Sequence, residues 1–222
     1  IAFSYVISRF LEKFFIGKLM MLLTKIGIYW MGTIAYLFIF FVFIDFVRVI
    51  ARLFSLQIDK FVYVGGIASL ILTLLLLVYG SWNAGNTKVV NYEVYVNKTS
   101  PVKELKAVMV SDIHLGNIVE NRSLKKMVKI INDLNPDIVF LAGDIIDSRL
   151  KPFQEGEMPD TLKGINSKYG VYAVLGNHEY YHENPDDIAR HYEEVGIRVL
   201  RDDYVKIEDF LYIVGREDKA VR

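Results

Sequence analysis

The stretch VMVSDIHLG, residues 108–116, carries the pattern from which we infer the fold of this chain. The six residues Leu105–Val110 end in an apolar run and predict a buried strand. Asp112 and His114 follow it with one residue between them, a spacing that can turn both side chains to the same side. In α/β proteins, chemistry is placed at the carboxyl ends of the strands. The stretch therefore predicts a functional carboxylate and imidazole at such an end.

The same arrangement occurs twice more along the chain. The apolar run Ile138–Ala142 precedes the sequence GDIID, residues 143–147, and the run Val171–Leu175 precedes GNHE, residues 176–179. Between the first two runs, apolar residues at helical spacing predict a helix over residues 121–134. A strand, a helix and a strand in this order imply a parallel pair of strands. We therefore expect the three polar loops to meet at one edge of a parallel sheet.

The polar side chains on these loops are hard or borderline metal ligands. Such a set suits Mn²⁺, Fe, Zn²⁺ or Mg²⁺ rather than a soft metal. Two such ions about 3.5–4 Å apart need a bridging carboxylate, and Asp144 on the middle loop is the natural bridge. The ions would activate a hydroxide for in-line displacement at phosphorus. The predicted ligand and site residues on the loops are Asp112, His114, Asp144, Asn177 and His178.

The composition of the 222 residues indicates a divided chain. Hydrophobic residues make up 53% and charged residues 23%, and the mean hydropathy is +0.28. These figures fit together if a very apolar region of about eighty residues precedes a domain of ordinary α/β composition. A formal net charge of zero gives no reason to expect nucleic acid as a partner. The absence of cysteine excludes disulfides and thiolate metal sites.

The N-terminal region, residues 1–87, is predicted to be a membrane region. The apolar segments 26–47 and 61–79 are each long enough to cross a bilayer, and together they form a helical hairpin. Residues 1–25 fit an amphipathic interfacial helix, the tail of a spanning helix or a packing helix. Asp45 is expected to pair at the interface with neighbouring arginines. The distribution of Lys and Arg favours a cytoplasmic C-terminal domain.

The C-terminal domain is expected to occupy residues 88–222. Strict alternation of apolar and polar residues predicts a strand over Lys88–Val96. A loop and a short helix are expected within residues 149–168, and a helix over Pro185–Val195. Three short strands are predicted last, over Ile197–Leu200, Tyr204–Ile207 and Phe210–Val214.

Taken in order, the three motifs resemble the signature of the calcineurin-like metallophosphoesterases, over roughly residues 104–216. The helical hairpin ahead of them is similar to that of bacterial membrane-anchored members. The resemblance implies an α/β fold, a four-layer α/β/β/α sandwich that is incomplete at its C-terminus. It also implies hydrolysis of phosphomonoesters or phosphodiesters with two divalent metal ions.

The resemblance also implies a role for each motif residue. His178 would not be a ligand: oriented by Asp147, it would donate a proton to the leaving oxygen or stabilise the transition state. The implied metal ligands are Asp112 and His114 for the first ion, Asp144 bridging both ions, and Asn177 for the second.

Several residues depart from the family pattern. The family completes its site with a lone histidine and a Gly-His-x-His motif, and this chain reaches Arg222 before either. Without these histidines we expect the chain to be inactive or poorly metallated by itself. Because it starts at Ile1 rather than Met and its last residues follow closely on an apolar strand, we also expect a fragment that is cut at both ends. His182 and His191 are expected on the surface or in packing, and Glu179 at a cap or on a solvated face. Ser148 stands where some relatives have a phosphate-contacting Arg, which puts that contact in doubt.

Two functional hypotheses follow. The first is a membrane-anchored phosphoesterase whose substrate is a phosphate ester, with a lipid-linked or cell-envelope ester suggested by location alone. The second places the function in the membrane hairpin, on the basis of Asp45, and makes the C-terminal domain a binding or regulatory module.

Overall fold

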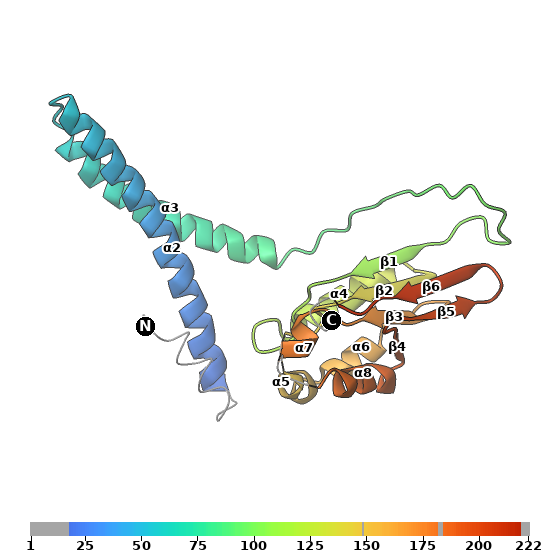
Figure 1. The fold of residues 1–222 in the computed structure, drawn as a ribbon. Helices are drawn as coiled ribbons and strands as arrows, with labels where there is room; N and C mark the ends of the chain where they lie inside the picture. Colours follow the sequence, from blue (N-terminus) through green and yellow to red (C-terminus); the bar gives the residue numbers. More distant parts are fainter. Residues whose placement is uncertain (1–17, 148, 182–183, 219–222) are drawn as a thin grey trace. The chain divides into compact units, whose positions relative to one another are not determined.

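The computed structural model describes residues 18–147, 149–181 and 184–218 (Figure 1). The chain divides into two units, Ile1–Val89 and Val90–Arg222, and each is described by itself. Most of the segment for which the sequence suggested an amphipathic helix, residues 1–25, lies outside the described residues.

The first unit is a hairpin of two long helices, α2 (Lys18–Leu53) and α3 (Asp59–Ala84). The helices pack closely because small residues lie between them: a Cβ added at Gly65 would approach the Cδ1 atom of Ile44 to 3.1 Å. A hydrogen bond of 2.7 Å also joins the hydroxyl groups of Tyr29 and Ser81 across the pair. Sequence motifs and packing thus both support a helical hairpin.

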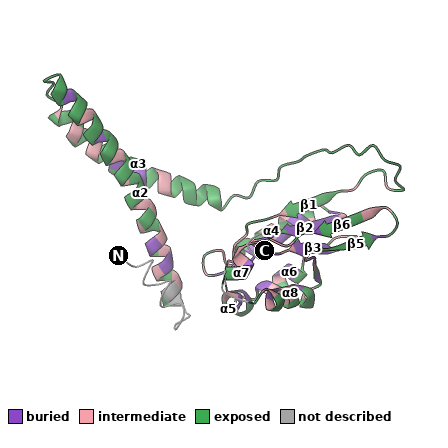
Figure 2. Ribbon diagram, in the orientation of Figure 1, coloured by how far each residue is buried: buried purple, intermediate pink, exposed green. Residues whose placement is uncertain are grey.

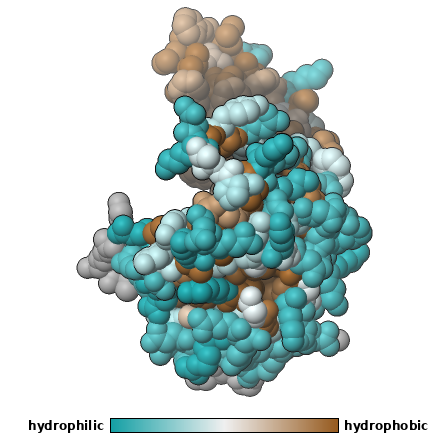
Figure 3. Space-filling view, turned by 90° about the vertical axis from the view of Figure 1, so that its right-hand side faces the viewer, coloured by the Kyte–Doolittle hydropathy of each residue, from teal (hydrophilic) through white to brown (hydrophobic). Residues whose placement is uncertain are grey.

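The outer surface of this hairpin is apolar. Most side chains of both helices are exposed (Figure 2), and leucine, phenylalanine and isoleucine predominate among them. In Figure 3 the hydrophobic surface gathers on this unit, whereas the second unit is mainly hydrophilic. Residues Met21–Leu53 and Asp59–Ala84 are long and apolar enough to cross a membrane, whose hydrocarbon core needs about 20 residues. Both helices extend beyond the segments 26–47 and 61–79 that the sequence indicated.

The second unit is built on a four-stranded parallel sheet in the order β1-β2-β3-β4. This confirms the predicted α/β fold. The strands are β1 (Ala107–Val110), β2 (Ile138–Ala142), β3 (Val171–Val174) and β4 (Ile197–Val199). The helices are α4 (Asn121–Asp133), α5 (Leu150–Glu155), α6 (Met158–Lys163), α7 (His178–Tyr181) and α8 (Pro185–Glu194).

The larger core lies between the sheet and its helices. Val139 and Leu141 of β2 are buried there against Leu124 and Ile131 of α4, which stand at helical spacing. In the strand register, Val110 pairs with Leu141 and Ala142 pairs with Val174. The carboxyl ends of β1, β2 and β3 are therefore level, and the loops that follow them lie at one edge of the sheet.

The opposite face of the sheet is covered by a hairpin of β5 (Asp203–Ile207) and β6 (Leu211–Gly215). Ile207 and Ile213 of this hairpin pack against Ile138 and Tyr172 of the sheet. The described part of the unit thus forms three layers, of helices, sheet and hairpin, and a second layer of helices is not seen among residues 90–218.

The strand predicted over Lys88–Val96 does not form, and that prediction is wrong for this structure. Residues 86–106 contain no helix or strand, and Val90, Tyr92 and Tyr95 are exposed. A strand needs the backbone of a neighbour to pair with, and no described residue pairs with residues 88–96. Residues 149–168 also differ from expectation, because they form the two short helices α5 and α6.

An ion pair ties the end of β6 to the loop before β5. The Arg201 Nε atom donates to both carboxylate oxygens of Glu217, at 2.8 and 3.1 Å. The Tyr180 hydroxyl donates to the same carboxylate, whose side chain is 13% exposed. The Arg201 hydrogen bond lowers the pKa of Glu217 below its ordinary value of 4.5.

We expect Glu217→Gln to lower the free energy of unfolding at pH 7 by about 1–3 kcal/mol, because the charged hydrogen bonds to Arg201 are lost. The folded-state pKa of Glu217 lies below its unfolded value, so the stabilisation is complete above pH 4.5 and is lost as the pH falls through the folded-state pKa. Thermal unfolding in detergent across this range measures the difference. The exposed Glu194→Gln serves as control, and a pH-independent gap between wild type and Glu217→Gln would contradict the assignment.

Candidate metal centre

The loops after β1 and β2 continue side by side beyond the ends of their strands. The backbone amide of Asp112 donates to the carbonyl of Gly143 at 3.1 Å, and that of His114 donates to the carbonyl of Asp144 at 3.0 Å. The amide of Leu115 donates to the carbonyl of Ile145 at 2.7 Å. The motif DIHL is thereby held along the motif GDII, as the parallel arrangement requires.

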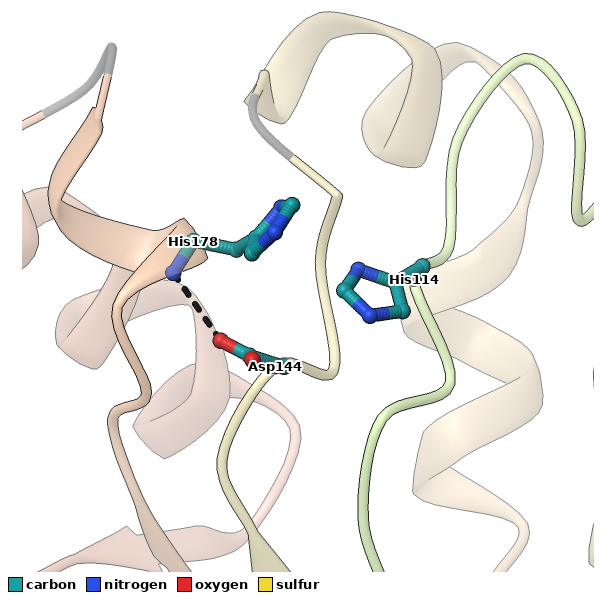
Figure 4. Close-up of side chains that lie close together, drawn as sticks. All are labelled: His114, Asp144 and His178. Atoms are coloured by element: carbon teal, nitrogen blue, oxygen red, sulfur yellow. Dashed lines mark hydrogen bonds between the residues drawn. The ribbon is translucent and has the colours of Figure 1, made fainter.

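Side chains from all three loops converge above this edge. His114, Asp144 and His178 each offer one ligand atom, and these atoms lie within 4.8 Å of one another (Figure 4). All three residues are half-buried. Two imidazole nitrogens and a carboxylate oxygen are donors that Zn²⁺, Mn²⁺ and Fe accept. The chemistry of the group therefore fits a divalent cation.

His178 is oriented by the loop after β2. Its backbone amide donates to Asp144 Oδ1 at 2.9 Å, which is the dashed contact in Figure 4. Its ring atom Nδ1 lies 2.5 Å from the carbonyl oxygen of Asp147 and 3.4 Å from the Oδ1 atom of Asp147. Since a carbonyl only accepts, Nδ1 carries the hydrogen and Nε2 is left for a ligand or a proton.

The carboxylate of Asp147 also faces His114. The distance from His114 Nδ1 to Asp147 Oδ1 is 3.9 Å, and the two imidazole rings meet edge to face with their centroids 4.3 Å apart. The structure thus brings together four of the predicted site residues: His114, Asp144, Asp147 and His178. His178 lies in the group that could hold a metal ion, whereas the family resemblance implied that it is not a ligand.

The remaining two predicted ligands lie on the same loops. Asp112 is exposed directly after β1 and is not part of the three-residue group. Asn177 is half-buried before α7, and its Nδ2 atom donates to the Tyr181 hydroxyl at 2.5 Å. This hydrogen bond fixes the orientation of the amide group. Its Nδ2 atom is used as the donor, and its Oδ1 atom is the oxygen that would bind a cation. The metal roles of Asp112 and Asn177 stay predictions.

The backbone is strained at the candidate ligands themselves. Asp112, His114 and Asp144 have φ angles of 54°, 53° and 52°, in the left-handed region that non-glycine residues seldom adopt. Each such residue costs about 1–3 kcal/mol and persists only where surrounding contacts hold it. Strain of this kind gathers at functional sites, and here it occurs on two adjacent motifs.

Two glycines allow the loops after β2 and β3 to approach. Gly143 has a φ angle of +85° and lies against Gly176. A Cβ added at Gly176 would lie 2.6 Å from the backbone nitrogen of Asp144, closer than real Cβ atoms come. The glycines of GDIID and GNHE are therefore required by close contact between the two loops.

One residue of the site was misjudged from sequence. Glu179, expected at a cap or on a solvated face, is buried with 1% of its surface exposed. Its position directly after Asn177 and His178 was the only sequence signal available.

His191 is half-buried on α8, where its Nδ1 atom donates to the carbonyl of Asp187 at 2.9 Å. Ser148 and His182 lie outside the described residues.

Comparison with known proteins identifies the family. A family model described as calcineurin-like phosphoesterase matches residues 105–220, which contain every loop of the candidate metal centre. The chain belongs to the calcineurin-like phosphoesterase family. Its members are metal-dependent, which agrees with the His114, Asp144 and His178 group.

Individual relatives come from vertebrates and bacteria. A zebrafish transmembrane protein with metallophosphoesterase domain is 33% identical over 164 residues, which cover 70% of this chain and 37% of that protein. A bovine protein of the same description is 30% identical over 161 residues, covering 68% of this chain and 36% of that protein. An uncharacterized metallophosphoesterase of Campylobacter jejuni is 38% identical over 114 residues, 51% of this chain and 30% of that protein. The chain thus spans about a third of the length of these relatives, and likeness to membrane-anchored members is not confined to bacteria.

We expect Gly176→Ala to weaken Mn²⁺ binding about tenfold and to lower the free energy of unfolding by about 1–3 kcal/mol, because the added methyl group must displace the backbone of Asp144. Titration calorimetry and thermal unfolding measure the two effects. Gly116→Ala is the matched control, since its Cβ would make an ordinary contact of 3.5 Å with Asp147. Equal behaviour of the two variants would show that the close approach of the loops is not needed.

Proposed function

We propose that the protein is a membrane-anchored, metal-dependent phosphoesterase. The observation that carries the proposal is the convergence of His114, Asp144 and His178 from three motif loops at the carboxyl edge of the sheet. Membership of the calcineurin-like phosphoesterase family supports a phosphoric ester as substrate.

The proposed site would hold two divalent cations through Asp112, His114, Asp144 and Asn177, with Asp144 shared between them. When bound, such ions supply an activated water and neutralise charge on the phosphoryl group. The chain's own contribution is to hold the ligands in place before binding, through the paired loops and the fixed amide of Asn177.

His178 is proposed as the proton donor to the leaving oxygen. The backbone carbonyl of Asp147 accepts a hydrogen bond from His178 Nδ1, and the carboxylate of Asp147 lies 3.4 Å from the same atom. The ring therefore has one fixed orientation, with Nε2 available for transfer of a proton. Asp147 acts in this scheme as a positioning residue.

Anchoring in a bilayer is supported by two independent observations. Helices α2 and α3 are long and apolar enough to cross a membrane, and their apolar side chains face outward. The matches to the zebrafish and bovine transmembrane proteins cover 70% and 68% of this chain. Residues 90–222 make up a smaller share of the chain, so both matches extend into the helical unit. We propose a substrate close to the membrane surface, such as a lipid-linked phosphate ester, and a cytoplasmic domain on the basis of the Lys and Arg distribution.

We expect Asp144→Asn to weaken Mn²⁺ binding about 100-fold and to abolish Mn²⁺-dependent hydrolysis of bis-(p-nitrophenyl) phosphate, because the carboxylate proposed to bridge the ions becomes a neutral amide. Calorimetry and a colorimetric assay on the protein in detergent measure both. The control is Asp160→Asn, on the exposed side of α6. Metal binding without turnover in the wild type would favour the second hypothesis, a binding or regulatory domain attached to a functional membrane hairpin.

We expect the double substitution of Leu74→Arg and Leu75→Arg to release the protein from liposomes. Both side chains are exposed in the middle of α3, where an arginine in the bilayer centre costs about 3 kcal/mol or more. Flotation after an alkaline wash reports the bound fraction. Asn86→Arg, beyond the end of α3, should leave it unchanged. Retention of the double variant would contradict a requirement for α3, because α2 would then hold the chain in the bilayer alone.

A further inference from the structure

A buried carboxylate lies directly beneath the candidate metal centre. Glu179 is the second residue of α7, and only 1% of its surface is exposed. Burial of a charged group is unfavourable unless hydrogen bonds compensate it. Its Oε1 atom accepts from the backbone amides of Ile145 and Ile146, at 2.8 and 3.0 Å, and from the Tyr192 hydroxyl at 3.3 Å. Its Oε2 atom accepts from the amides of Asp144 and Gly176, at 3.0 and 2.8 Å.

These contacts join two loops that strand pairing does not join. The ladder between β2 and β3 ends at the pair Ala142 and Val174. Beyond it, Glu179 links residues 144–146 to Gly176 by receiving their N–H groups on one side chain. Consecutive N–H groups that point at one acceptor form a concave site for an anion, and here the anion is a side chain of the chain itself.

Two of these residues, Asp144 and Ile145, are also held from the other side. The carbonyl oxygens of Asp144 and Ile145 accept from the loop after β1, while the amides of both residues donate to Glu179. A residue has one backbone donor and one acceptor, so both groups of each residue are used. This double attachment explains how Asp144 keeps its left-handed φ angle of 52°.

Glu179 is not itself placed to bind a metal. Both of its oxygens already accept hydrogen bonds, five in all, from four amides and one hydroxyl. Tyr192 remains a donor, because burial and the negative charge of Glu179 raise the pKa of its hydroxyl well above the ordinary value. The carboxylate therefore acts on the site through the backbone.

We propose that Glu179 is a positioning residue of the metal centre: its carboxylate fixes the turn 144–146 against Gly176, so that the carboxylate of Asp144 is held beside His114 and His178. The proposal rests on the proposed function for its metal, but the contacts of Glu179 with the turn are independent of any ion. A carboxylate is needed because all of its partners are donors. A glutamine would present an NH₂ group to at least one of them.

The experiment compares Glu179→Gln with Glu179→Asp, which retains the charge on a shorter side chain. Hydrogen exchange is followed at the amides of residues 144–146, and Mn²⁺ affinity is measured by titration calorimetry, both on the whole chain in detergent. In Glu179→Gln we expect faster exchange at these three amides and Mn²⁺ affinity lowered by about 10–100-fold, the effect of losing a group that orients a ligand. Glu179→Asp should recover part of both losses.

Three controls separate positioning from general stability. Ile131→Val removes a methyl group from the core at α4, a helix that makes none of the hydrogen bonds to Glu179, and should lower the unfolding temperature without changing Mn²⁺ affinity. Tyr192→Phe removes one of the five hydrogen bonds and should change that affinity less than threefold. Asp144→Asn should lose Mn²⁺ binding yet keep slow exchange at the amides of residues 145 and 146.

The outcomes are distinct. A folded Glu179→Gln protein with wild-type exchange and Mn²⁺ affinity would overturn the proposal. If Glu179→Gln does not fold, Glu179→Asp decides: wild-type exchange and affinity in that variant overturn the proposal, and loss of both supports it. If wild-type protein fails to bind Mn²⁺, the proposed function falls, while the exchange data still report whether Glu179 holds the turn.

Discussion

The turn at residues 144–146 is held by hydrogen bonds on both of its sides, and the candidate metal centre depends on this arrangement. The loop after β1 donates to its carbonyl groups, and Glu179 accepts from its amides. Parallel strands end level at one edge of the sheet, which brings the loops near one another. Hydrogen bonds beyond the strand ends then convert this proximity into one fixed geometry.

The cost of that geometry is visible in the backbone. Left-handed φ angles at Asp112, His114 and Asp144 are unfavourable by about 1–3 kcal/mol each. Hydrogen bonds to a buried, charged acceptor are stronger than neutral ones, and four amides share the carboxylate of Glu179. Glycine at 143 and 176 removes the steric barrier to the same contact. The fold itself thus holds one potential ligand atom each of His114, Asp144 and His178 within 4.8 Å of one another.

The two units meet different physical requirements. The parallel sheet buries its apolar strands under helices on one face and a hairpin on the other, leaving a largely hydrophilic surface. The helices α2 and α3 leave their apolar side chains outward, which water disfavours and lipid accommodates. This division accounts for a mean hydropathy of +0.28 in a chain with 23% charged residues.

The sequence alone predicted the α/β fold, the two apolar helices and the loops of the site. Apolar periodicity is a local property of the chain, and the order of the motifs that contain Asp112, Asp144 and His178 is read directly along it. Tertiary structure decided the rest. The alternating segment Lys88–Val96 remained without a strand, since a strand exists only beside a partner. Glu179 was predicted at a cap or on a solvated face. In the structure it is buried, and it accepts hydrogen bonds from backbone amides of a loop more than thirty residues away in the sequence. Burial and hydrogen-bond partners of this kind arise from long-range packing, which no local pattern contains.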